Sequence, residues 1–255
     1  MKNSFHNPSN ASVRPLNQEA EAIVAMSMNS KIALHLRELE IARNPESPHY
    51  AMPEFSKDDQ AILDVGCGIG QTLVGAQLET DKLLVGLDID LELLNFGRRQ
   101  FGYIKFVNGT AERLPFQNNS FDFVISRVAL PYTNIPQSLA EIARVLKENG
   151  SVWFTMHSFS KTTKHLKQSI RKFDIKDVVY ESYAIANGVF FHFFGRLFYF
   201  PVNKRYLSFQ TKSGMEKCMK KIGFIEICVQ DGNHFVCTAR KGGLTLMRSP
   251  LVKRQ

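Results

Sequence analysis

The chain has 255 residues, of which 44% are hydrophobic and 22% are charged, a composition that is ordinary for a folded globular protein and excludes an intrinsically disordered one. This length suffices for one well-buried α/β domain. Residues 1–13 are polar and lack the apolar stretch of a secretory signal, and no run of about 18 apolar residues occurs, so we expect a cytoplasmic protein without a spanning helix.

The net charge of +8 is unevenly distributed along the chain. Residues 1–150 hold 14 Lys/Arg and 18 Asp/Glu, whereas residues 151–255 hold 18 Lys/Arg and only 6 Asp/Glu. A basic second half suggests an anionic partner, such as nucleic acid, a membrane surface contacted peripherally or an acidic substrate. A solvated basic face without a partner is the alternative.

The first predicted element is a helix over residues 17–43, because Met28, Ile32, Leu36 and Leu39 recur at helical spacing. From about residue 60, short apolar runs alternate with helical patterns. We predict strands over 61–65, 82–87, 103–107, 121–126 and 151–156. We predict one helix over 71–79, a second from the cap Asp90 to about residue 101, and a third that includes 139–146 and ends at Asn149-Gly150. This alternation predicts a Rossmann-like α/β fold, with a mostly parallel sheet and helices on both faces.

The alternation stops after Met156 for about fifty residues and resumes with a helix over 214–222. The last two strands, 225–229 and 235–239, flank an Asp-Gly turn and should form an antiparallel hairpin, which completes a seven-stranded sheet. We therefore divide the chain into an N-terminal arm and helix (1–50), a main domain (51–240) with a basic and aromatic insert (158–212), and a basic tail (241–255).

The strongest functional signal is the loop from Asp64 to Gly70, which follows the first strand of the predicted sheet. Ligands bind at the carboxyl ends of strands in open α/β sheets, and glycines let the backbone approach a ligand closely. A dinucleotide fingerprint would place glycines at 66, 68 and 71, but here they stand at 66, 68 and 70, and position 71 is Gln. An acidic residue followed by this glycine spacing resembles motif I of the class I S-adenosylmethionine-dependent methyltransferases.

A second signal is Asp88, which ends the second predicted strand in Gly-Leu-Asp-Ile-Asp. A carboxylate at this place can accept hydrogen bonds from both hydroxyls of a ribose, whereas Asp90 is better placed to cap the next helix. Nicotinamide enzymes use the same position, so Asp88 indicates a nucleoside without selecting the cofactor.

A third motif selects the cofactor. The sequence Gly-Thr-Ala-Glu-Arg-Leu-Pro-Phe (109–116), followed by Ser-Phe-Asp (120–122), resembles the adenine-binding loop and fourth strand of the type 11 methyltransferases, a group that includes ubiquinone- and menaquinone-methylating enzymes. Their usual loop has Asp where this chain has Thr110. The Thr110 hydroxyl or Glu112 could take the place of that carboxylate at adenine.

The resemblance covers residues 60–156 well and implies S-adenosylmethionine as cofactor. It implies methyl transfer by in-line displacement, in which the protein mainly holds the reactants close and aligned. The four cysteines have no zinc-type spacing with histidines, so we expect no metal site. The residues it assigns to the cofactor are Asp64, Gly66, Cys67, Gly68, Gly70, Asp88, Ile89, Thr110, Ala111, Glu112 and Arg127.

His157, which directly follows the fifth strand, is the candidate general base, and Tyr132, which follows the fourth strand, is a second candidate catalytic residue. His157 could instead be a surface or capping histidine. The resemblance places the acceptor lid in the insert 158–212, and the N-terminal helix could close over the same opening.

Aromatic residues crowd the insert and favour a planar or lipid-like small-molecule acceptor, although they could instead form the core of the insert. One alternative is a nucleic-acid methyltransferase that would bind phosphates through a basic run and stack an exposed base on the aromatics. That run comprises Lys161, Lys164, Lys167, Arg171 and Lys172. The other alternative is a non-catalytic cofactor-binding scaffold.

Overall fold

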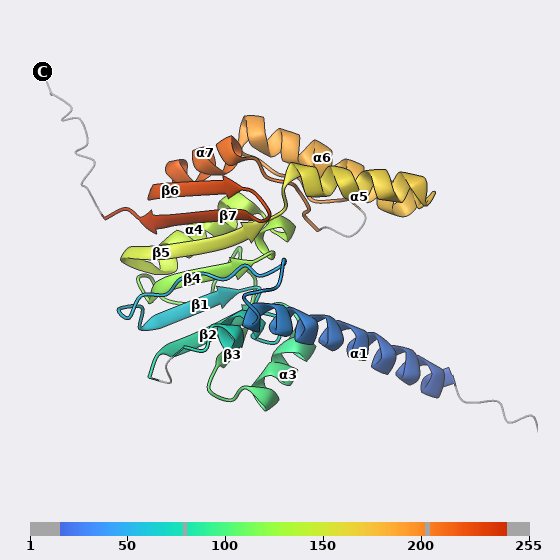
Figure 1. Ribbon diagram of the computed structural model, residues 1–255, viewed down its shortest axis with the longest axis horizontal. Helices are drawn as coiled ribbons and strands as arrows, with labels where there is room; N and C mark the ends of the chain where they lie inside the picture. The colour runs from blue at the N-terminus through green and yellow to red at the C-terminus, as the bar shows by residue number, and fades with distance from the viewer. Residues whose placement is uncertain (1–15, 79–80, 202–204, 244–255) are drawn as a thin grey trace, which may run out of the picture.

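The computed structural model describes residues 16–78, 81–201 and 205–243, with only the backbone for the first fourteen of them. Its centre is one seven-stranded sheet of order β3-β2-β1-β4-β5-β7-β6 (Figure 1). The first five strands are parallel and β7 pairs antiparallel with β5 and β6, so the predicted mostly parallel sheet with a C-terminal hairpin is confirmed.

The strands and helices alternate along the chain as expected from residue 61 to residue 156. The strands are β1 (Ala61–Val65), β2 (Leu83–Asp88), β3 (Lys105–Asn108), β4 (Phe121–Arg127), β5 (Leu146–Met156), β6 (Phe224–Asp231) and β7 (Phe235–Lys241). The helices are α1 (Leu16–Arg43), α2 (Gln71–Gly75), α3 (Leu91–Gln100), α4 (Ile135–Val145), α5 (Phe159–Arg171), α6 (Ile175–Phe194) and α7 (Lys212–Ile222), with a 3-10 turn at Leu130–Tyr132.

Two hydrophobic clusters, one on each face of the sheet, hold the helices in place. Neighbouring residues of β1 divide between them, because Leu63 lies in the cluster with α4 and α7 whereas Ile62 lies in the cluster with α1, α2 and α3. Successive side chains of a strand point to opposite faces, and all five residues of β1 are therefore buried. The result is the expected three-layer arrangement.

Two segments lie beside the carboxyl ends of the parallel strands. Helix α1 runs from the lower part of this edge, and the paired helices α5 and α6 extend from its upper part (Figure 1). The insert, for which the sequence pattern gave no regular structure, therefore contains two helices. Asp174 caps α6 by accepting from the backbone N–H of Asp177, and Gly195 ends it in the left-handed conformation.

Several predicted boundaries are wrong. The helix predicted to reach Asn149-Gly150 ends at Val145, because Leu146, which fits the buried face of a helix, instead begins β5 and pairs with Phe121. Asn149 and Gly150 lie within β5, where Asn149 adopts a positive φ of 63°. Helix α2 ends at Gly75, four residues earlier than predicted, where it packs closely on Ala42 of α1.

Smaller differences affect strand ends. Strand β2 ends at Asp88, β3 covers 105–108, and both strands of the hairpin are longer than predicted. The expected arm over residues 1–15 and the tail from residue 244 lie outside the described residues. Within the described chain, no helix combines the length and the apolar character needed to cross a bilayer.

Candidate active site

The glycine loop joins β1 to α2 and is tied to β2 by its backbone. The N–H groups of Gly66 and Cys67 donate to the carbonyl of Leu87 at 2.7 and 3.0 Å. Gly66, Gly68 and Gly70 all have positive φ, which favours glycine at each position. A Cβ on Gly68 would lie 2.5 Å from the ring of His35 in α1, so this loop also meets the N-terminal helix closely.

Asp88 lies at the end of β2, beside the glycine loop, as the sequence predicts. Its Oδ2 accepts from the backbone N–H of Gly68 at 2.8 Å, and its Oδ1 accepts from that of Asp90 at 2.9 Å. Each oxygen keeps a second lone pair that could accept a further hydrogen bond. Asp90 caps α3 by accepting from Glu92 and Leu93, in agreement with its predicted role.

Asp64 is the most unusual side chain of the loop. It is 1% exposed, and neither carboxylate oxygen has a hydrogen-bond partner among the described residues. Burial raises the pKa of Asp64 to about 7, with a further contribution from the Asp88 charge, against the opposing effects of the Arg127 charge and the nearby Thr72 hydroxyl. Because a buried polar group without a partner is costly, these orphaned oxygens fit a ligand that brings a cationic donor.

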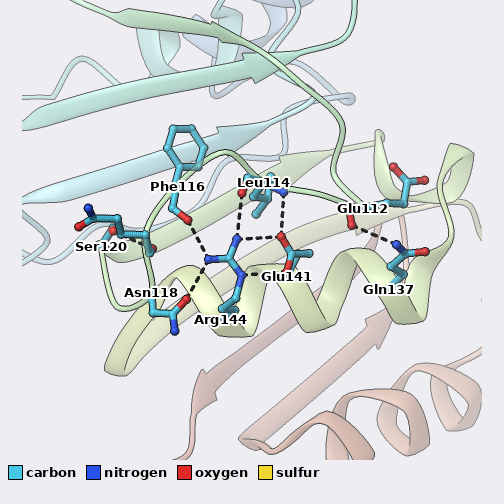
Figure 2. Close-up of polar contacts among 9 residues, drawn as sticks. Glu112, Leu114, Phe116, Asn118, Ser120, Gln137, Glu141 and Arg144 are labelled. Atoms are coloured by element: carbon cyan, nitrogen blue, oxygen red, sulfur yellow. Dashed lines mark hydrogen bonds and ion pairs between the residues drawn. The ribbon is translucent and has the colours of Figure 1, made fainter.

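The loop after β3 is held by helix α4 (Figure 2). The Arg144 guanidinium donates to the carbonyls of Leu114 and Phe116 at 2.9 and 2.7 Å, and Glu141 accepts from the N–H of Leu114 at 2.8 Å. Glu141 and Arg144 are also paired at 2.8 Å. This pair fixes the Leu-Pro-Phe segment. The sequence analysis did not predict this role, although opposite charges three residues apart on a helix indicate a possible ion pair.

The three loop residues predicted to contact adenine differ in their surroundings. Ala111 is buried, Thr110 is exposed, and the carboxylate of Glu112 accepts from the backbone N–H of Asn134 at 3.0 Å. Glu112 thus satisfies an N–H at the start of α4. Ile89, also predicted here, is 69% exposed.

Arg127 connects the end of β4 to helix α1. Its guanidinium lies 2.8 Å from the carboxylate of Glu38, and its side chain is only 7% exposed. His35, one turn earlier in α1, lies over the glycine loop, where burial lowers the pKa of its imidazole against the effect of Asp88. The N-terminal helix was expected to lie over the site, but these two side-chain contacts could not be predicted, because they join segments far apart in the chain.

His157 and Tyr132 lie together, as a shared site requires. The His157 Nε2 is 3.1 Å from the Tyr132 hydroxyl. Burial, and then the nearby charges of Lys161 and His165, lower the pKa of His157 to about 4, so the imidazole is neutral at physiological pH. Burial raises the pKa of Tyr132.

A cavity of about 640 Å³ opens at the carboxyl ends of β4 and β5, between α1, the first turns of α5 and the β6–β7 turn. Arg127 and Thr155 line it from the sheet, and Glu38 lines it from α1. None of the described aromatic side chains of the insert lines this cavity. Instead they largely contact one another, as Phe190 does with Phe194 and Phe198.

Among the described residues, no group of three or more His, Cys, Asp or Glu side chains is placed to hold a metal ion.

Comparison with known proteins identifies the domain. A model of the type 11 methyltransferase domain matches residues 63–154. An uncharacterized protein from Methanocaldococcus jannaschii is 41% identical over 101 residues, which cover 39% of this chain and 38% of the relative. A demethylmenaquinone methyltransferase from Symbiobacterium thermophilum is 39% identical over 109 residues, which cover 39% of this chain and 43% of the relative. The chain thus spans about two fifths of the length of these curated relatives.

The fold is also known from solved structures. A SAM-dependent methyltransferase from Thermotoga maritima superposes with a TM-score of 0.50 at 17% identity, over 87% of this chain and 95% of that one. The sequence match covers β1 to β5, which contain the glycine loop, Asp88 and the loop after β3. Residues 63–154 of this chain therefore match a methyltransferase domain of the type 11 group, and the sheet around them has the fold of a solved methyltransferase.

Proposed function

We propose that the protein transfers a methyl group from S-adenosylmethionine to a small-molecule or lipid-like acceptor. The observation that carries the proposal is the buried, unpartnered carboxylate of Asp64. Asp64 lies in β1, directly before the glycine loop, and β1 pairs with β2, which ends at Asp88. A nucleoside with a cationic amino acid end offers what these residues lack, a charged donor for Asp64 and ribose hydroxyls for Asp88.

The residues proposed to hold the cofactor are those at the ends of three strands. Asp64 and the backbone of the glycine loop would hold the amino acid end, and Asp88 the ribose. Ala111, with Thr110 and the exposed apolar side chain of Ile89, would flank the adenine. Since Glu112 already accepts from Asn134, we assign it to positioning this loop.

When bound, S-adenosylmethionine supplies an electrophilic methyl group, so the chain needs mainly to align the acceptor and exclude water. The neutral imidazole of His157 can accept a proton from an acceptor that must lose one, with the Tyr132 hydroxyl 3.1 Å away to orient it. Arg127, held by Glu38, would form the wall between the cofactor and the acceptor cavity.

Melting experiments with S-adenosylhomocysteine test the cofactor. We expect it to raise the melting temperature, whereas NADH should not, because ligands that bind only the folded state stabilise it. Asp88→Asn should reduce the shift strongly, and Asp81→Asn, at an exposed position just before β2, should not. Absence of both stabilisation and calorimetric heat with S-adenosylhomocysteine would refute the proposal.

The acceptor is tested by incubating the protein and labelled cofactor with extract from cells that lack the protein. Label in the small-molecule or lipid fraction supports the proposal, and label in nucleic acid supports the alternative. His157→Gln should lower turnover without changing cofactor affinity. An unchanged turnover would remove His157 as the base.

A further inference from the structure

The cavity beside Arg127 has an unusual charge. Four cationic side chains line it, Arg37, Arg127, Lys161 and Lys164, against the single carboxylate of Glu38. That carboxylate is already occupied by Arg127 at 2.8 Å. Arg37, Lys161 and Lys164 form no ion pair with any described residue, so three positive charges face the cavity without compensation.

The sheet contributes an unpartnered hydroxyl to the same cavity. Thr155, near the end of β5, is 3% exposed, and its Oγ1 has no hydrogen-bond partner among the described residues. A hydroxyl buried in this way can donate to a ligand, and leaving it unpaired has a cost. The Nε2 of His234, which lines the cavity from the β6–β7 turn, is likewise buried without a partner.

The first turn of α5 adds to the positive potential. This helix of 13 residues begins at the cavity, and Ser158 caps it by accepting from the N–H of Lys161. The amino end of a helix carries a partial positive charge, and anions are stabilised there.

We propose that this cavity binds an anionic group of the methyl acceptor, a carboxylate or a phosphate, through Lys161, Lys164 and Arg37 with Thr155 as a hydroxyl donor. The inference rests on the proposed methyltransferase function and specifies its acceptor. A volume of about 640 Å³ is that of a pocket for a small molecule. Nucleic acid, by contrast, presents a row of phosphates that a longer basic surface would track.

Anion binding can be measured through two histidines that line the cavity, His49 and His234. Their imidazole NMR signals, identified by single substitution, can be followed while inorganic phosphate or acetate is added. Both signals should shift and saturate in the wild-type protein. The probe that binds more tightly distinguishes a phosphate from a carboxylate.

The decisive variant is Lys161→Gln combined with Lys164→Gln, which should weaken anion binding at least tenfold. Lys167→Gln is the matched control, because Lys167 is exposed on the same helix and does not line the cavity. Equal binding in all three proteins, or no shift of either signal with both anions, would overturn the proposal. A single-stranded RNA oligonucleotide that binds more tightly than phosphate and requires the same two lysines would also overturn it.

The melting shift with S-adenosylhomocysteine, measured on the same proteins, separates the two proposals. A preserved shift in the double variant together with lost anion binding supports an acceptor site distinct from the cofactor site. A missing shift in every protein refutes the methyltransferase proposal, whatever the anion titration gives. A normal shift without anion binding in the wild type refutes only the acceptor assignment.

Discussion

At the scale of single residues, two side chains carry unusual protonation equilibria. Burial raises the pKa of Asp64 to about 7 and lowers that of His157 to about 4, and they flank the carboxyl ends of the same sheet. Both shifts favour the neutral forms, as burial does in general. A cationic ligand beside Asp64 would restore its charge, so binding and protonation should be linked.

Asp64→Asn should separate ligand binding from stability. In the wild type, the folded state binds more protons than the unfolded state between pH 4 and about 7, so the contribution of Asp64 to the free energy of unfolding falls as pH rises through this range. The variant should lack that fall, which chemical denaturation at several pH values would detect. Its affinity for S-adenosylhomocysteine should drop about tenfold or more, equal to about 1.4 kcal/mol. An unchanged affinity would remove Asp64 from the cofactor site.

His157 should make the protein sensitive to acid. The unfolded imidazole gains its proton near pH 6.5, whereas the folded one stays neutral until about pH 4. Stability should therefore fall as pH drops through this window, by at most about 1.4 kcal/mol per pH unit from this group. Denaturant titrations of wild type and His157→Gln should converge toward pH 4. Parallel pH profiles would show that His157 titrates normally.

At the scale of elements, the loop after β3 depends on α4 for its shape. Arg144 satisfies two of its carbonyls, and Glu141 one of its amides, so a helix on one face of the sheet fixes a loop at its edge. The Leu-Pro-Phe motif and the charged pair on α4 thus form one structural unit, although the bonded residues are 27 to 30 positions apart in the sequence.

Arg144→Gln should loosen this unit. Loss of the charge-assisted hydrogen bonds should cost about 1–3 kcal/mol of stability. Amide hydrogen exchange at Leu114 should accelerate, and affinity for S-adenosylhomocysteine should fall. Arg99→Gln, at an exposed position in α3, is the control and should change none of these. Normal cofactor affinity in a destabilised Arg144 variant would show that the loop shape does not affect the site.

At the scale of the molecule, α1 joins the two halves of the site. Lys31 pairs with Asp90 at the start of α3, His35 lies on the glycine loop, and Glu38 pairs with Arg127 beside the basic cavity. One helix therefore contacts the proposed cofactor residues and the proposed acceptor residues. We therefore expect the position of α1 to depend on both sets of contacts.

Glu38→Gln should weaken the attachment of α1 to the sheet. Because Arg127 is nearly buried and would lose its charged partner while Glu38 is 41% exposed, we expect a loss of about 1–2 kcal/mol in the free energy of unfolding. Hydrogen exchange along residues 30–43 should accelerate as well. Glu40→Gln, on the exposed side of the same helix, should leave both unchanged. Equal exchange in the two variants would contradict the role of this ion pair.

The sequence predicted those parts of the fold that depend on local pattern. Short apolar runs that alternate with helical patterns predicted the approximate position of every strand of the sheet. The glycine spacing together with Asp88 predicted the cofactor loop. The boundary between α4 and β5 was wrong because Leu146 satisfies both a helix face and a strand pairing. The contacts of His35 and Glu38, and the basic cavity, arise from segments distant in the chain, and no local pattern encodes them.

The position of Trp153 has a practical consequence. It is the chain's single tryptophan, it is 6% exposed on β5, and it shares a hydrophobic cluster with Leu39 of α1. Its fluorescence therefore reports on the core beneath that helix without any added label. We expect the emission to shift to the red in Glu38→Gln, because weaker packing of α1 would expose the indole to water, and S-adenosylhomocysteine should reverse the shift. Stopped-flow mixing with this ligand would then measure how fast α1 packs against the sheet.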